Sequence, residues 1–306
     1  ETIDLSQLSA LTFIGGYSFG GYNSPAQTTL MMPNNCNLLM IGSQAFERVK
    51  ISSLDLSNCG KLNHIGDGAF HYAPLTSLTF APNSAVTYIG YYTFCAARVT
   101  SLDLSTLSNL EFIHGFAFEN IQVTELDFSK TPKLTYIGAG AFKHANKLTN
   151  INFSGASALT LIGAQAFEKA QLISLDLSGA PNISLLGNDV FRNSPLQSLK
   201  LPVSLQYIGY RAFEYNKLAH LDLSNVTSLK YIGQWAFSYQ NLATIQPLSS
   251  INFGNNCAIT FIHDGAFKNS QITHLDLSVC KALTYLGKSV FEKSPLQTLQ
   301  FDNPAL

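Results

Sequence analysis

Apolar residues recur along this chain in a fixed order. In stretches such as "ISSLDLSNCGKL" (51–62), leucines alternate with polar residues, which predicts a strand with one buried face. A second stretch of the form "IGxxAF" follows each strand and returns about every 24 residues. Aligning it places twelve of the 21 phenylalanines in one column: Phe19, Phe46, Phe70, Phe94, Phe118, Phe142, Phe167, Phe191, Phe213, Phe237, Phe267 and Phe291. One such unit cannot bury its own apolar face, so the repeat predicts a stack of equivalent turns.

The spacing of the leucines indicates which stack this is. Periods of about 20 to 29 residues that carry LxxLxL are typical of leucine-rich repeats, and the stretches 99–110, 172–183, 218–229 and 272–283 repeat the spacing seen in 51–62. Leu54 and Leu56 should point inward, and the phenylalanine column should close the core from the opposite wall. We expect one leucine-rich-repeat solenoid over residues 1–306, of the α/β-type repeat class, with about twelve repeats. Its concave side should carry a parallel sheet of short strands, with mostly irregular structure on the convex side.

The glycine that precedes the variable pair in "IGxxAF" forms a second column. It is present in ten of twelve units: Gly15, Gly42, Gly66, Gly90, Gly138, Gly163, Gly187, Gly209, Gly233 and Gly287. This column predicts a backbone with positive φ. The two exceptions are His114 and His263, and we expect them to be turn residues rather than metal ligands, since histidine is also enriched at positive φ.

The stretch "LTYIGAGAFKHANKLTNI" (134–151) is similar to the BspA-like group of leucine-rich repeats, found in surface proteins of gut bacteria and some parasitic protists. The resemblance covers all twelve units. It implies an exported, non-catalytic adhesion or recognition module, located at the cell surface or outside the cell. Many members carry isoleucine and proline where this chain has "LDLS", which leaves open whether any known partner carries over.

Composition narrows the classes of partner. The chain is 46% hydrophobic and 12% charged, with a net charge of −1, so it can bury a large core. This balance does not suggest nucleic acid as a partner, and no apolar run is long enough to cross a bilayer. The opening "ETIDLS" already reads as a strand, so we expect a fragment of a longer exported protein. Two stretches, 20–29 and 238–250, lengthen the period and predict surface loops.

Five cysteines occur, at Cys36, Cys59, Cys95, Cys257 and Cys280. An odd number without paired spacing does not predict a disulfide framework or a zinc site, and we expect buried free thiols. The chain also lacks a GxSxG nucleophile elbow and a phosphate-binding loop. We therefore expect no enzyme activity, no metal and no cofactor.

The residue between the two leucines of each strand should face outward on the concave sheet. Seven of the eleven aspartates lie in this column, where acids mostly alternate with uncharged residues, which suggests a double unit of 48 residues. The candidate partner-binding residues are the outward-facing residues of this concave sheet, which we call its floor: Asp55, Asp103, Glu125, Asp127, Asp176, His220, Asp222, His274 and Asp276. Such a floor could accept a basic or hydroxyl-rich ligand, or its acids and serines could only keep an exposed sheet soluble.

A third column precedes "IG" and is aromatic in most units. Its candidate ligand-binding residues are Tyr88, Phe112, Tyr136, Tyr207, Tyr231, Phe261 and Tyr285. The rings could form a ladder that stiffens the array, or an exposed strip that binds sugar rings or a protein. The sequence thus favours a surface module that binds a protein through its concave face. A carbohydrate-binding module that uses the aromatic column is one alternative, and a structural spacer is another.

Overall fold

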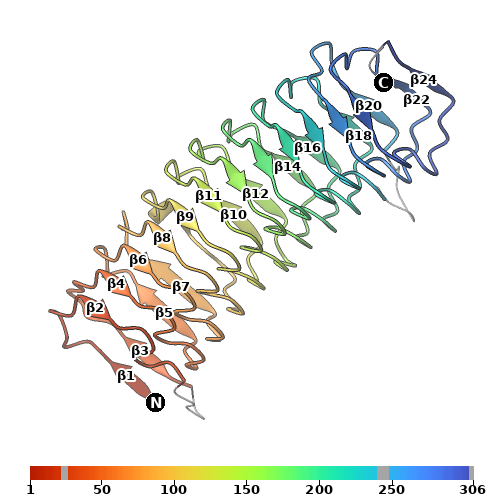
Figure 1. Ribbon diagram of the computed structural model, residues 1–306. Helices are drawn as coiled ribbons and strands as arrows, with labels where there is room; N and C mark the ends of the chain where they lie inside the picture. The colour runs from red at the N-terminus through yellow and green to blue at the C-terminus, as the bar shows by residue number, and fades with distance from the viewer. Residues whose placement is uncertain (22–26, 240–247, 303–306) are drawn as a thin grey trace.

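The computed structural model describes residues 1–21, 27–239 and 248–302. The chain winds into an elongated solenoid with its two ends far apart (Figure 1). Most of the predicted surface loops at 20–29 and 238–250 lie outside the described residues. The predicted fold class, a leucine-rich-repeat solenoid of about twelve turns, is confirmed.

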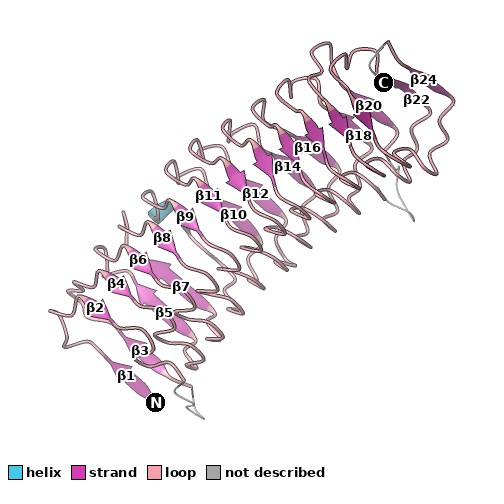
Figure 2. Cartoon of the chain, viewed as in Figure 1, coloured by secondary structure: helices cyan, strands magenta, loops and turns pink. Residues whose placement is uncertain are grey.

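Each turn contributes one two-residue strand to a single twelve-stranded parallel sheet, here called the spine sheet (Figure 2). These strands are the residues just before each "G" of the repeat, and neighbours in the stack are neighbours in sequence order. They are β2 (Phe13–Ile14), β4 (Met40–Ile41), β6 (His64–Ile65), β8 (Tyr88–Ile89), β9 (Phe112–Ile113), β11 (Tyr136–Ile137), β13 (Leu161–Ile162), β15 (Leu185–Leu186), β17 (Tyr207–Ile208), β19 (Tyr231–Ile232), β21 (Phe261–Ile262) and β23 (Tyr285–Leu286).

The leucine strands form a second set, which pairs only two by two. The pairs are β1 (Thr2–Asp4) with β3 (Thr29–Met31), β5 (Ser53–Leu56) with β7 (Ser77–Phe80), β10 (Glu125–Asp127) with β12 (Asn150–Asn152), β14 (Ser174–Asp176) with β16 (Ser198–Lys200), β18 (His220–Asp222) with β20 (Ser250–Asn252), and β22 (His274–Asp276) with β24 (Thr298–Gln300). A 3-10 turn, η1 (Leu104–Thr106), takes this place in the fifth turn. The sequence located strands here but did not anticipate that the continuous sheet would lie in the other column.

A ladder of stacked phenylalanine rings fills the core. All twelve predicted rings stack in order, with centroids from 5.0 Å (Phe19 to Phe46) to 5.9 Å (Phe267 to Phe291) apart. The ten rings from Phe46 to Phe267 are fully buried, whereas Phe19 and Phe291 at the two ends are only partly buried. Leu54 and Leu56 are each 1% exposed and pack into the same core, as predicted.

The glycine column has a different cause from the one predicted. A Cβ on Gly138 would lie 2.5 Å from the backbone nitrogen of Gly115 in the turn below and 2.6 Å from the carbonyl carbon of His114. No side chain fits at such a distance, so close approach between turns selects glycine here. Positive φ occurs instead two residues before and two residues after each core phenylalanine, as at Tyr92 (φ 54°) and Ala96 (φ 65°). The prediction of positive φ in the glycine column, and at His114 and His263, is therefore wrong.

The prediction of five free thiols is also wrong. Disulfides join Cys36 to Cys59 and Cys257 to Cys280, and only Cys95 is free. Each bridge joins equivalent positions of two consecutive turns, whose Cα atoms lie 4.8 Å apart. That distance is close to the ordinary spacing of stacked strands and within the range a disulfide can span. Stacking therefore pairs cysteines that are 23 residues apart in sequence.

The bridges lie near the two ends of the solenoid, where a turn has few neighbours. Replacing Cys257 and Cys280 together by serine should lower the free energy of unfolding by about 2 to 4 kcal/mol, because the bridge restricts the unfolded chain. Urea unfolding of the two proteins measures the difference. The control is Cys95→Ala, which removes a thiol without breaking a bridge and should cost about 1 kcal/mol. Equal stability of wild type and the serine variant would contradict the bridge.

Candidate recognition surfaces

The aspartates of the leucine strands share one local bond. In each, Oδ1 accepts the backbone N–H of the residue two positions later, at 2.8 to 3.0 Å: this holds for Asp4, Asp55, Asp103, Asp127, Asp176, Asp222 and Asp276. Asn152 and Asn252 make the same bond at 3.0 Å. The side chain thus closes the turn that ends each strand. The recurrent pattern of Asp or Asn followed two residues later by serine carried this signal, and the sequence interpretation missed it.

This bond fixes the carboxylates on the surface. All seven of these aspartates are exposed. In the described part of the chain, Oδ2 of Asp55, Asp103 and Asp127 accepts no hydrogen bond, whereas Oδ2 of Asp176 accepts one from Lys200 at 3.0 Å. Hydrogen bonds from Ser278 hold the pKa of Asp276 below its usual range. The column therefore presents carboxylate oxygens that the turn bond holds in position.

The structure places all nine predicted concave residues on one surface, which we call the strand face: the outward side chains of the paired strands and of the Asp103 turn. Eight acids lie on it, Asp4, Asp55, Asp103, Glu125, Asp127, Asp176, Asp222 and Asp276, against one base, Lys200. His220 and His274 are exposed, and their Nδ1 atoms contact Ser250 Oγ at 2.7 Å and Thr298 Oγ1 at 2.8 Å. These residues are spread along the solenoid and do not converge on one point.

Shallow grooves cross the strand face where the strand pairs are interrupted. The groove between β7 and η1 has a volume of about 330 Å³ and that between β12 and β14 about 390 Å³. A third groove of about 390 Å³ separates β16 from β18. Each has a candidate acid in its wall: Asp103, Asp176 and Asp222 in turn. The grooves therefore place candidate acids beside hollows at three positions along the strand face, although not at a fixed spacing.

The aromatic column lies on the spine sheet, where its rings are partly to well exposed. Among the candidate residues, the exposed fraction is highest at Phe261, 42%, and at Tyr285, 38%. Two pairs of rings stack along the solenoid axis: Tyr207 and Tyr231 are 4.5 Å apart at 8°, and His64 and Tyr88 are 4.2 Å apart at 13°. Phe261 and Tyr285 are 5.9 Å apart and tilted by 34°. Stacked rings cover each other's faces, and a sugar ring would need such a face to be open. This geometry supports a stiffening role for the column.

Carboxylates near the aromatic column tie successive turns together, a feature the sequence did not suggest. Asp67 Oδ1 accepts hydrogen bonds from the Tyr91 backbone at 2.9 Å and from the Tyr88 hydroxyl at 3.4 Å. Asp264 Oδ1 accepts them from the Lys288 backbone at 2.9 Å and from the Tyr285 hydroxyl at 3.1 Å. Burial lowers the pKa of His114, which packs against Tyr88 and Tyr91 and is therefore neutral at neutral pH.

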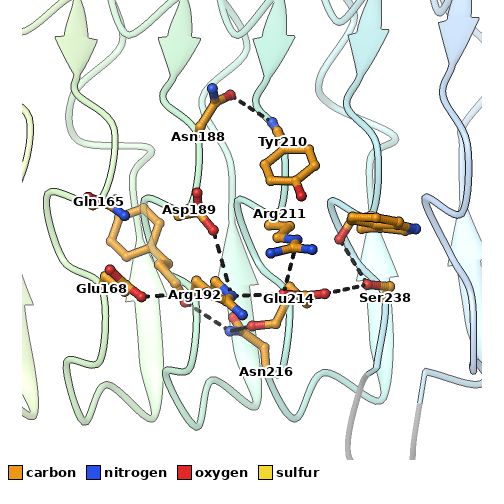
Figure 3. Close-up of polar contacts among 12 residues, drawn as sticks. Gln165, Glu168, Asn188, Asp189, Arg192, Tyr210, Arg211, Glu214, Asn216 and Ser238 are labelled. Carbon is orange, nitrogen blue, oxygen red and sulfur yellow. Dashed lines mark hydrogen bonds and ion pairs between the residues drawn. The ribbon is translucent and has the colours of Figure 1, made fainter.

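From Glu119 to Glu214, the residue after each core phenylalanine is alternately acidic and basic, and we call these residues the charge ladder. Figure 3 shows the part around Arg192. Glu168 and Glu214, 5% and 2% exposed, flank Arg192. Arg192 Nε donates to Glu214 Oε2 at 2.8 Å, and its Nη1 lies 3.7 Å from Glu168 Oε1. Lys143 continues the ladder with an ion pair to Glu168 at 3.3 Å. Charges of opposite sign in successive turns thus hold the stack together from inside.

The free cysteine, Cys95, follows the core phenylalanine of the turn before Glu119. Cys95 Sγ donates to Glu119 Oε2 at 3.5 Å, and burial raises the pKa of the thiol to about 12. Such a thiol is protonated at neutral pH and is a poor nucleophile. Among the described residues, no group of three His, Cys, Asp or Glu side chains is placed to hold a metal ion. The described ranges likewise contain no helix with the length and apolar character of a membrane span.

Several solved structures resemble this chain. A leucine-rich repeat protein from Bacteroides ovatus is 19% identical, with a TM-score of 0.52, over 92% of this chain and 68% of its own. The functional domain of InlJ from Listeria monocytogenes is 17% identical, with a TM-score of 0.49, over 97% of this chain and 52% of its own. The pneumococcal vaccine antigen PcpA is 18% identical, with a TM-score of 0.46, over 99% of this chain and 75% of its own. At these identities the Bacteroides likeness shows the fold alone.

The chain spans about half of the length of the InlJ domain that it matches, 52%. No curated protein sequence matches this chain. The family model for the BspA type leucine rich repeat region matches in overlapping copies over residues 1–112, 63–194, 111–243 and 160–297. These matches cover nearly every turn, including the glycine, phenylalanine and leucine columns described above. The chain therefore belongs to the BspA-type leucine-rich repeat family.

Proposed function

We propose that this chain is a cell-surface recognition module that binds a protein with a basic surface through its strand face. Leucine-rich repeats of this family serve as surface protein-interaction modules and are typically non-catalytic, which supports the general role. The observation that carries the proposal is the segregation of charge: eight acids and one base on the strand face of a chain whose net charge is only −1. Such a face attracts and orients a basic partner.

Two further features support this proposal. The turn bond holds each aspartate in place before any partner arrives, so little side-chain entropy would be lost on binding. The grooves between strand pairs interrupt an otherwise flat surface, and a partner's side chains could fit into them. The two disulfides are stable in an oxidising compartment, which supports an extracellular location.

The structure itself offers a way to remove charge without breaking the turn. Asparagine makes the same turn bond at Asn152 and Asn252. A variant with Asp55, Asp103 and Asp127 replaced by asparagine should therefore keep its fold and lose affinity for a basic partner by about tenfold or more, because three charges are gone. The measurement is surface plasmon resonance against a partner first captured from secreted host proteins and mucins, at increasing salt.

A matched control removes three charges away from both the strand face and the aromatic column, as Glu47→Gln, Glu292→Gln and Asp302→Asn. It should bind like wild type. A partner that binds both variants equally at high salt would exclude the strand face and would favour the aromatic column, which is the carbohydrate alternative. Failure to capture any partner would favour the structural spacer.

A further inference from the structure

A second charged surface lies beside the strand face and is positive. It comprises, among the described residues, the stretch from the second to the sixth residue after each core phenylalanine, which leads into the leucine strand; we call it the basic rim. Across all twelve turns these stretches contain none of the 19 acids of the chain and seven of its 18 Lys and Arg residues. The seven are Arg48, Lys50, Arg98, Lys147, Lys169, Lys217 and Lys293. The net charge is therefore near zero because the acids of the strand face and the cations of the basic rim nearly cancel.

The middle of the basic rim contains a polar hollow of about 630 Å³. It is lined by residues from three successive turns: Ala96, Arg98, Thr100, Asn120, Gln122 and Lys147. Arg98 and Lys147 are exposed, and within the described part of the chain neither side chain takes part in an ion pair or a hydrogen bond. No acid lines the hollow. Glu119, the residue before Asn120, is engaged by Cys95 and by His144 at 3.7 Å.

The chemistry of the lining selects among anionic ligands. Two cations with no competing carboxylate suit an anionic group, because charge-assisted hydrogen bonds are the stronger ones. The hydroxyl of Thr100 and the amides of Asn120 and Gln122 can exchange hydrogen bonds with neighbouring sugar hydroxyls. The hollow has no aromatic side chain on which a nucleic acid base could stack, and no apolar wall beyond Ala96 for the side chains of an acidic peptide.

We propose that this hollow binds a glycan that carries sulfate or carboxylate groups, with Arg98 and Lys147 holding the anionic group. The site is separate from the strand face and does not depend on the function proposed for it. Because the rest of the basic rim continues along the solenoid axis, an extended acidic polysaccharide would meet further cations in the turns on either side, such as Lys169.

The test compares four probes in surface plasmon resonance: dextran sulfate, carboxymethyl dextran, uncharged dextran and an oligo(dT) strand. Wild type should bind at least one of the two anionic dextrans, and the preferred one identifies the anionic group. The variant Arg98→Gln/Lys147→Gln should bind it about tenfold more weakly or worse. The charge-conserving variant Arg98→Lys/Lys147→Arg should retain most of the binding.

The control is Lys133→Gln/Lys230→Gln, which removes two exposed lysines outside the basic rim. It should lose less than about threefold, since screening weakens charges beyond about 8 to 10 Å. An equal loss in both variants would show attraction by overall charge and would overturn the site. Absence of binding to both anionic dextrans would overturn it too, as would tighter binding of oligo(dT) than of either dextran.

Discussion

Replacing Arg192 by methionine is expected to lower the free energy of unfolding by about 3 kcal/mol, because Glu168 and Glu214 lose the guanidinium that they share. Among the described residues, these buried carboxylates then keep only the ion pairs to Lys143, at 3.3 Å, and to Arg211, at 3.6 Å. Arg192 lies between Glu168 and Glu214 in the charge ladder, and these carboxylates are 5% and 2% exposed (Figure 3). Methionine keeps the apolar length of the side chain and removes only the guanidinium. Urea unfolding followed by the fluorescence of Trp235, the single tryptophan, measures the loss.

A second variant in the same column serves as the control. Lys268→Met breaks the pair between Lys268 and Glu292, whose side chains are 21% and 40% exposed and lie 2.9 Å apart. Exposed ion pairs contribute little to stability, so this change should cost far less than Arg192→Met. If both variants lost the same amount, burial would not be what makes the ladder important. Glu168→Gln/Arg192→Met/Glu214→Gln should recover part of the loss, because the two most deeply buried carboxylates are then neutral.

The second large effect is expected in the phenylalanine ladder. Phe142→Ala should destabilise the solenoid by about 3 to 5 kcal/mol, through lost burial and the cavity left in the core. Phe142 is fully buried and stacks at 5.3 Å on both Phe118 and Phe167. Urea unfolding followed by circular dichroism gives the difference.

The position of the ring along the stack provides the comparison. Phe19 is partly buried and stacks on Phe46 alone in the ladder, so Phe19→Ala should cost less than half as much as Phe142→Ala. Equal losses at the two positions would mean that the end turns are covered as well as the middle ones. That result would contradict the exposure of the first turn.

The core could be predicted from the sequence because the same buried positions of each turn require apolar residues, which therefore recur at a regular spacing. Leu54, Leu56 and the phenylalanine column were assigned correctly, since only apolar side chains suit those positions in every turn. The glycine column was located correctly but explained wrongly. Contact with the turn below, as between Gly138 and Gly115, is not visible until the spacing between turns is known.

Contacts between turns account for most of what the sequence did not reveal. Cys36 and Cys59 are far apart along the chain, and only the stacking of turns makes them neighbours. The charge ladder and the basic rim were missed for a related reason, since a net charge of −1 averages over columns of opposite sign. Counting charges column by column would have found both. Whether the predicted strand-face residues bind a partner remains a prediction.

The pairing of leucine strands two by two has a mechanical consequence. Under tension between the two ends, the spine sheet resists separation at every turn, because its hydrogen bonds run without a break from β2 to β23. The opposite side has no such ladder between β12 and β14 or between β16 and β18. Extension would therefore widen those gaps first, and the solenoid would bend about its spine before it yields. One side of the solenoid is therefore stiff under tension, and the opposite side is compliant.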